Sequence, residues 1–508
     1  MSMNFCFSSL KGIFENKCRI IDMNEEIRAL EPKILWNKFA DLNAVPRPSK
    51  KEERVIEFIK KFGNDLDLKT EVDSVGNVVI CKPATTGLEN RKKIVLQAHL
   101  DMVHQKNNDT DFDFDTQGIE MYVDGDWVRA KGTTLGADNG LGVATMMAIL
   151  ESNSIEHPAI EALFTIDEET GMTGAKGLSP DLLEGDILLN LDTEEDDEIG
   201  IGCAGGVDIT ASRTYKVEST PDSYRAFAIK VKGLMGGHSG MDIIKGLANA
   251  NKLMNRLLLN TTEEYKLRLS SINGGGLRNA IPRESEAIIA LPETEEESFK
   301  KELEKRIALI KAEFSSLEPN MKFEIQKVPS EVEIMDIDSQ KQLLQALAAA
   351  HNGVYRMSPE IEDLVEASNN VAKVSVEEGT IEIKCLTRSS VESSRDDLAD
   401  SLKSVFELAG FDVKLSGEYP GWAPNSDSDI LKTLDEIYER MNGQKANIAA
   451  CHAGLECGII GSHYPEMDMI SFGPTIRGAH SPDERASISS AQKYWKFLLE
   501  VLKNIPEN

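Results

Sequence analysis

The sequence has no apolar run that approaches the roughly 20 consecutive residues needed by a membrane-spanning helix. With 41% hydrophobic and 28% charged residues, the 508-residue chain has the composition of a soluble globular protein. Its length suggests two to three domains, because a single hydrophobic core does not normally grow this large. We therefore expect a multidomain protein without a membrane partner.

An excess of positive charge is also missing. The formal net charge is -29, whereas a surface that binds nucleic acid by counterion release needs clustered lysine and arginine. The composition therefore argues against nucleic acid as a partner.

Cysteine is scarce, and the spacing of the cysteines does not suggest disulfide pairs or a metal-binding motif. The seven cysteines form no CxxC motif, and their number is odd. This usage favours a reducing, cytoplasmic location over a disulfide framework.

The first 22 residues have neither the long apolar core nor the small-residue cleavage site of a secretory signal. We interpret residues 1–22 as an N-terminal extension, with the catalytic domain starting at Met23.

Strand-like and helix-like segments alternate in the first part of the chain. Such alternation predicts an α/β domain whose mixed, mostly parallel sheet has helices on both faces. The apolar strand segments are 77–82, 94–103, 162–167 and 186–192. Functional groups in such sheets gather beyond the carboxyl ends of the strands. Polar clusters at strand ends or at a helix start contain His99 with Asp101, Asp138, Glu168 with Glu169, and Asp192.

After Gly206 the pattern changes to the order β-α-β-β-α-β, which is typical of a ferredoxin-like unit. A similar order recurs from a helix near residues 340–350 to a strand at 411–419. We therefore predict an inserted α+β domain of two ferredoxin-like halves over residues 206–420. The catalytic domain would then comprise residues 23–205 and 421–508.

Two adjacent carboxylates, Glu168 and Glu169, directly follow a buried strand, where they would repel each other unless a cation lay between or beside them. A pair of zinc ions about 3.5 to 4 Å apart accepts histidine and carboxylate ligands and shares a bridging carboxylate. Two histidines and three carboxylates would supply such a site, and three carboxylates with one hydroxide would balance two dications. The chain offers His99, Asp138, Glu169, Asp192 and His480.

Two further carboxylates remain for other tasks in this scheme. Glu168 would take a proton from the attacking water and give it to the leaving amine. Asp101, two residues from His99, would orient the imidazole of that ligand.

Five motifs carry a resemblance to a known family. QAHLDMV, GADNGLG, DEETGMTGA, NLDTEE and GAHSPDE, in this order and at these separations, resemble the M20 family of co-catalytic metallopeptidases and, within it, the aminoacyl-histidine dipeptidases. The resemblance covers nearly the whole chain from about Met23, including the double-sized insert. It implies two zinc ions per chain, with cobalt or manganese as substitutes that suit the same ligands.

The resemblance assigns His99 and Asp192 to one zinc, Glu169 and His480 to the other, and Asp138 to both. It makes Glu168 the general base and Asp101 the support of the histidine ligand. The insert resembles the family's lid, in which His238 of GGHSG stabilises the oxyanion. Asn279 and Arg388 resemble substrate contacts, and the backbone near Gly454 in HAGLECG resembles the part that receives the dipeptide's carboxylate.

The resemblance implies hydrolysis of small peptides with broad specificity, and above all of Xaa-His dipeptides such as carnosine. The same chemistry also fits a general dipeptidase, a tripeptidase or an N-acyl amino acid deacylase. A non-enzymatic metal-binding protein on this scaffold is a further alternative, although such a protein would be expected to lose Glu168. We expect a monomer or a homodimer in which His238 acts within its own chain.

Several of these residues also allow a structural interpretation in place of a functional one. His238 could lie in an exposed turn between glycines, and Arg388 could pair with nearby carboxylates, with Arg395 as a competitor for its role. His452 and Glu456 could simply pack the HAGLECG segment.

Overall fold

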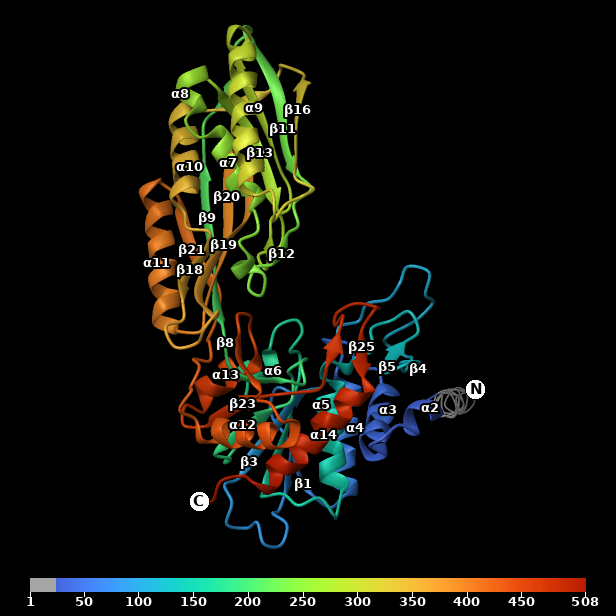
Figure 1. Ribbon diagram of the computed structural model, residues 1–508. Helices are drawn as coiled ribbons and strands as arrows, with labels where there is room; N and C mark the ends of the chain where they lie inside the picture. Colours follow the sequence, from blue (N-terminus) through green and yellow to red (C-terminus); the bar gives the residue numbers. More distant parts are fainter. Residues whose placement is uncertain (1–23) are drawn as a thin grey trace, which may run out of the picture. The chain divides into compact units, whose positions relative to one another are not determined.

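The computed structural model describes residues 24–508, so the predicted extension over residues 1–22 lies outside the described residues. Two compact units are present (Figure 1). The first contains the described residues through Ile201 together with Pro424–Ala450 and Ile459–Asn508. The second contains Gly202–Ala423 and Cys451–Gly458.

The segment Cys451–Gly458 departs from the predicted boundaries, which placed all of residues 421–508 in the catalytic domain. The segment packs with the second unit because the amide of Ala204 donates to the carbonyl oxygens of both Cys451 and Ala453, at 2.9 Å each. A Cβ atom at Gly240 would lie 2.0 Å from the carbonyl oxygen of His452. Only a glycine at position 240 permits this approach.

The first unit is built on an eight-stranded sheet. Its order is β1 (Lys69–Val72), β2 (Val78–Lys82), β6 (Ile160–Thr165), β3 (Ile94–His99), β7 (Ile187–Asn190), β23 (Asp468–Ser471), β8 (Glu198–Cys203) and β22 (Asn447–Cys451). Strands β6, β3, β7 and β23 run parallel, and the flanking pairs β1–β2, β2–β6 and β23–β8 are antiparallel. This arrangement confirms the predicted mixed sheet, with its parallel strands in the centre.

The parallel strands lie in the middle of the sheet because their sequences are apolar on both faces. Every residue of β3, β6 and β7 is buried, as expected for strands covered by helices on each side. The helices are α2 (Glu25–Arg28), α3 (Lys33–Asn43), α4 (Glu53–Asp65), α5 (Ala137–Glu151), α6 (Thr173–Lys176), α12 (Asp429–Asn442), α13 (Glu456–His463) and α14 (Ile488–Lys503). No helix in residues 24–508 is long and apolar enough to cross a membrane.

A small four-stranded sheet in the first unit pairs strands from the C-terminal part of the chain with strands from its N-terminal part. Its order is β24 (Ile476–Arg477), β25 (Arg485–Ser487), β5 (Trp127–Ala130) and β4 (Met121–Asp124). The loop between β24 and β25 contains residues 478–484. Antiparallel pairing of β25 with β5 fixes the position of this loop.

The second unit has one sheet of nine strands. The order is β16 (Lys322–Val328), β11 (Tyr224–Lys232), β15 (Ser285–Pro292), β13 (Arg268–Gly275), β19 (Val365–Glu377), β20 (Thr380–Ser389), β9 (Gly205–Thr214) and β21 (Asp412–Tyr419), with β18 (Gly353–Met357) paired to β19. Four helices, α7 (Ala250–Leu258), α9 (Glu296–Glu313), α10 (Ile337–Ala349) and α11 (Glu392–Leu408), bury their apolar residues against this sheet in one core (Figure 1).

The two halves of this sheet follow the same pattern. In the half made of β11, α7, β13, β15, α9 and β16, the strands lie in the spatial order fourth, first, third, second. The half made of β9, α10, β19, β20, α11 and β21 has the same order. The first half is thus inserted between β9 and α10 of the second.

Strand β9 was missing from the sequence-based prediction, which started the second half at a helix. Its sequence alternates the buried residues Val207, Ile209 and Ala211 with more exposed polar ones. That alternation is the signal of a half-buried strand. Because the partners β20 and β21 lie more than 160 residues later in the chain, local order did not reveal where β9 belongs.

Candidate metal centre

The candidate ligands of the first unit come from three strand ends, a helix start and a loop. His99 is the last residue of β3, Asp192 follows β7, and Glu168 with Glu169 follow β6. Because β3, β6 and β7 are parallel neighbours, these residues emerge at the same edge of the sheet. Asp138 belongs to the first turn of α5, where its backbone is not helical. His480 lies in the loop between β24 and β25.

Asp138 lies between the two histidines. Its Oδ1 atom is 3.1 Å from Nε2 of His99, and its Oδ2 atom is 3.2 Å from Nε2 of His480. Asp192 approaches the same nitrogen of His99 at 3.5 Å, and Glu169 approaches that of His480 at 2.9 Å. The structure therefore brings together all five residues that the sequence predicted, as two sets that share Asp138.

The donor set fits a pair of divalent ions. One set of ligand atoms comes from His99, Asp138 and Asp192, the other from Asp138, Glu169 and His480, and within each set the atoms lie within 4.8 Å of one another. In addition, the buried Oε1 atom of Glu169 has no hydrogen-bond partner in the structure. Imidazole nitrogens and carboxylate oxygens in this number suit zinc.

The electrostatics of the cluster also favour positive charge. Burial raises the pKa of Glu169 and of Asp192, and the neighbouring Asp138 carboxylate raises both further. Hydrogen bonds from His480 to Asp138 and Glu169 raise the pKa of this histidine to about 11. Closely spaced buried carboxylates are stabilised by any cation that enters the site.

Asp101 connects two of the ligand-bearing segments. Its carboxylate is 3.4 Å from Nδ1 of His99 and accepts a hydrogen bond from Ser49 Oγ at 2.8 Å. It also accepts the backbone amides of Glu168 at 3.0 Å and Glu169 at 3.3 Å. Burial raises its pKa, but the contacts with His99, Ser49 and the Glu168 amide together outweigh burial and bring the value to about 2. Asp101 is therefore an anion that faces the His99 ring.

Glu168 lies beside the cluster without being one of the five. It is half-buried, and one of its carboxylate oxygens lies within 4.8 Å of ligand atoms of His99 and Glu169. A carboxylate in this place can reach a water molecule held by the cluster.

Glu484, the last residue of the GAHSPDE motif, is a structural member of the site that was not predicted from the sequence. Its carboxylate accepts four backbone amides, those of residues 135–138, at 2.7 to 3.2 Å. These amides precede the regular part of α5, where a negative charge is favourable. Glu484 thereby fixes the loop that carries His480 to the segment that carries Asp138.

Arg47 is a second residue that sequence reasoning missed. Its fully buried guanidinium donates to the carbonyl oxygens of Leu100, Asp101 and Gly136 at 2.6 to 3.1 Å. It links the chain after β3 to the start of α5. The only available signal was its place in the proline-bounded PRP segment.

A chain of buried polar side chains crosses the sheet beneath the ligands. Gln97 of β3 donates to Thr165 of β6 at 3.1 Å, and Asn190 of β7 donates to Gln97 at 2.6 Å. Ser471 of β23 donates in turn to Asn190. We call these four fully buried residues the polar ladder. It joins four neighbouring strands, and in three of them it lies two to four residues before a candidate ligand: His99, Glu169 or Asp192.

The second unit holds the remaining predicted site residues. His238 in β12 (Gly237–His238) pairs with Ala280 of β14 (Ala280–Ile281), which brings it next to Asn279. The backbone carbonyl of Asn279 accepts the amide of Ser239 at 2.8 Å, and the Asn279 residue is exposed. Gly454 lies just before α13.

The two arginines that competed for one role differ in their partners. Arg395 forms ion pairs with Asp396 at 2.9 Å and with Glu418. Arg388 is 4% exposed and, among the described residues, makes no ion pair within 4.0 Å. Its Nη1 atom donates to the hydroxyl of Tyr419 at 2.8 Å, and its Nη2 atom is 3.5 Å from Nε2 of His238.

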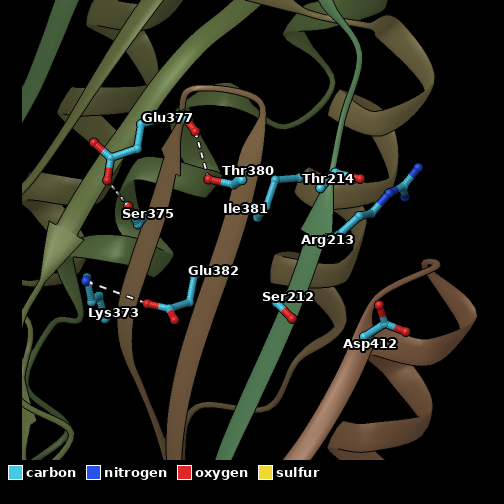
Figure 2. Close-up of a pocket in the computed structure, with 10 residues that line it drawn as sticks. All are labelled: Ser212, Arg213, Thr214, Lys373, Ser375, Glu377, Thr380, Ile381, Glu382 and Asp412. Atoms are coloured by element: carbon cyan, nitrogen blue, oxygen red, sulfur yellow. Dashed lines mark hydrogen bonds and ion pairs between the residues drawn. The ribbon is translucent and has the colours of Figure 1, made fainter.

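A hollow of about 450 Å³ on the second unit's sheet is separate from these residues (Figure 2). It is lined by residues of β9, β19, β20 and β21, none of which is a predicted site residue. Its polar groups largely engage one another, since Lys373 approaches Glu382 at 3.7 Å and Ser375 donates to Glu377 at 2.9 Å.

Comparison with known proteins gives consistent matches. The model of peptidase family M20/M25/M40 matches residues 95–504. The cytosol non-specific dipeptidase of Escherichia coli (strain K12) is 44% identical over 481 residues, 95% of this chain and 99% of that protein. The crystal structure of aminoacylhistidine dipeptidase from Vibrio alginolyticus is 45% identical with a TM-score of 0.89, covering 95% of this chain and 98% of that one.

A more distant match supports the fold but gives no information about function. The aminopeptidase PepT from Bacillus cereus has a TM-score of 0.55 at 15% identity, with 94% of this chain and 99% of that chain covered. The extent of the family match and the identity to the Escherichia coli protein agree with the five motifs in the sequence. The chain therefore belongs to peptidase family M20/M25/M40.

Proposed function

We propose that the protein is a metal-dependent dipeptidase that hydrolyses dipeptides, Xaa-His among them, with broad specificity. The observation that carries the proposal is the position of Asp138, whose two carboxylate oxygens face His99 and His480 separately. The names of the two similar proteins, a non-specific dipeptidase and an aminoacylhistidine dipeptidase, support the choice of substrate.

In this proposal His99 and Asp192 would hold one zinc ion, Glu169 and His480 would hold the other, and Asp138 would contribute to both. Cobalt or manganese would suit the same ligands. Two such ions, when bound, supply Lewis acidity to the peptide carbonyl and lower the pKa of water. Asp101 and Glu484 keep the ligands in place through the contacts described above.

Glu168 is assigned the role of general base. Its carboxylate takes the proton of the attacking water and then gives it to the nitrogen of the leaving residue, which departs as an amine. His238 donates a hydrogen bond to the oxygen that becomes negative in the tetrahedral intermediate. Asn279, Arg388 and the backbone near Gly454 bind the substrate.

A general dipeptidase without histidine preference is the second candidate, because the name of the Escherichia coli relative records no preference. That name also supports the proposal of a cytoplasmic location. Peptide substrates are the only partners that the proposal requires, in either a monomer or a homodimer.

The variant Glu168→Gln tests the role of the base. The amide cannot accept the proton, so we expect kcat to fall by at least about 100-fold, within the range for loss of a general base. The two metal sites should keep their occupancy, measured by elemental analysis, because Glu168 is not a ligand in the proposal. Glu53→Gln on the exposed surface of α4 is the control. Full activity of Glu168→Gln would contradict the proposed mechanism.

A further inference from the structure

Arg388 is a buried cation that lacks a counter-ion among the described residues. It is 4% exposed, and its Nε atom has no hydrogen-bond partner. Burying a guanidinium without an anion is costly. The contrast with Arg395, which has two carboxylate partners, indicates that the anion for Arg388 comes from a ligand.

The neighbouring histidine adds a second donor at the same place. Nδ1 of His238 accepts the backbone amides of Gly240 at 3.3 Å and Met241 at 3.1 Å. A ring nitrogen that accepts carries no proton, so in the neutral ring the proton is on Nε2. Nε2 of His238 and Nη2 of Arg388, 3.5 Å apart, are then both donors. Two converging donors match an anionic oxygen.

The strand register explains how Arg388 reaches Tyr419. In the sheet, Gly206 of β9 is the direct partner of Arg388 on β20 and of Tyr419 on β21. Gly206 has no side chain to separate them. A Cβ atom at this position would lie 2.7 Å from the Tyr419 hydroxyl oxygen, so the glycine leaves the space that the phenol occupies.

Tyr419 is itself held in place. Its carbonyl oxygen accepts a hydrogen bond from Nη1 of Arg395 at 3.0 Å. Burial raises the pKa of the phenol, which keeps the hydroxyl neutral and leaves its oxygen as an acceptor for Arg388.

We propose that Tyr419 is a positioning residue of the substrate site, whose hydroxyl holds Arg388 so that the guanidinium and His238 donate to the same substrate oxygen, the one that becomes negative in the tetrahedral intermediate. The inference rests on the proposed function, since the ligand is the dipeptide. Without the hydroxyl, Arg388 keeps its charge but loses the contact that fixes its orientation.

The test compares four metal-loaded, full-length proteins: wild type, Tyr419→Phe, Arg388→Met and the double variant. With glycyl-leucine as substrate, Tyr419→Phe should lower kcat/KM by about 10-fold, as expected for a lost hydrogen bond to a charged group. Most of the loss should appear in kcat, because this oxygen carries its negative charge only in the tetrahedral intermediate. In the Arg388→Met background the same change should alter kcat/KM by less than about twofold, because Tyr419 acts through Arg388.

Tyr215→Phe, in the same unit and packed against the same core, is the control for loss of a tyrosine hydroxyl. Equal melting temperatures of the two phenylalanine variants would show that the effect is not one of stability. A loss of the same size in both backgrounds, or none in either, would overturn the inference. Wild-type hydrolysis of glycyl-leucine tests the proposed function separately from this comparison.

Discussion

At the residue scale, the site depends on side chains that serve two neighbours at once. Asp138 faces both histidines, and Asp101 contacts His99 while accepting the amides of Glu168 and Glu169. Such shared contacts couple the positions of the ligands.

Two histidines of the second unit, the half-buried His238 and the buried His452, lead to a prediction about pH. Burial, followed by the charge of Arg388, lowers the pKa of His452 to about 3 and that of His238 to about 4. An unfolded histidine has a pKa of about 6.5, so between these values the unfolded chain binds more protons than the folded one. Stability from these groups is thus complete above about pH 6.5 and is lost as the pH falls.

His452→Gln isolates one of these contributions. At pH 5 a histidine with the shift of His452 costs about 2 kcal/mol of unfolding free energy relative to pH 7. Urea unfolding of metal-free protein at the two pH values should therefore show a smaller difference for His452→Gln than for wild type. The metal-free protein is used so that loss of metal in acid does not contribute. If the difference in unfolding free energy between pH 5 and pH 7 were the same for the two proteins, His452 would not have the lowered pKa described here.

At the element scale, the strands of the first unit bring the candidate ligands together, and the polar ladder joins the strands that carry them. The ladder joins β6, β3, β7 and β23 at buried positions where a hydrogen bond in a low-dielectric environment is directional. A shift of one strand would move His99, Glu169 or Asp192 relative to the others.

Asn190→Leu is the variant that tests the ladder. The leucine fills a similar volume but leaves Gln97 and Ser471 without their shared partner, so we expect metal affinity to fall by about 10-fold or more. Competition with a chelator measures the affinity. Asn255→Leu, which removes a buried asparagine of the second unit, should lower stability without affecting metal affinity. Unchanged affinity in Asn190→Leu would show that the ladder serves stability alone.

The same elements show what sequence could and could not predict. Apolar strands that end in polar pairs predicted the edge where His99, Glu169 and Asp192 meet, because parallel strands end together. The contacts of Glu484 and Arg47 were not predictable, since both act on backbone groups of distant segments. The place of β9 depended on partners far along the chain, and the packing of Cys451–Gly458 depended on the amide of Ala204.

At the scale of the whole molecule, the proposed chemistry is divided between two units. All five candidate metal ligands and Glu168 belong to the first unit, whereas His238, Asn279, Arg388 and Gly454 belong to the second. The insertion of one ferredoxin-like half within the other gives the second unit one continuous nine-stranded sheet that both halves share. Assays of function therefore require the full chain.

The central claim is that the cluster around Asp138 binds metal ions on which dipeptide hydrolysis depends. The most direct measurement is the rate of hydrolysis of β-alanyl-histidine and of glycyl-leucine by the full chain, before chelation, after chelation and after zinc is restored. We predict that both activities disappear on chelation and return with zinc, with β-alanyl-histidine preferred. Zinc-restored cleavage of glycyl-leucine alone would indicate a general dipeptidase. Hydrolysis that persists in the fully chelated protein, or that is absent from the zinc-loaded protein, would contradict the account.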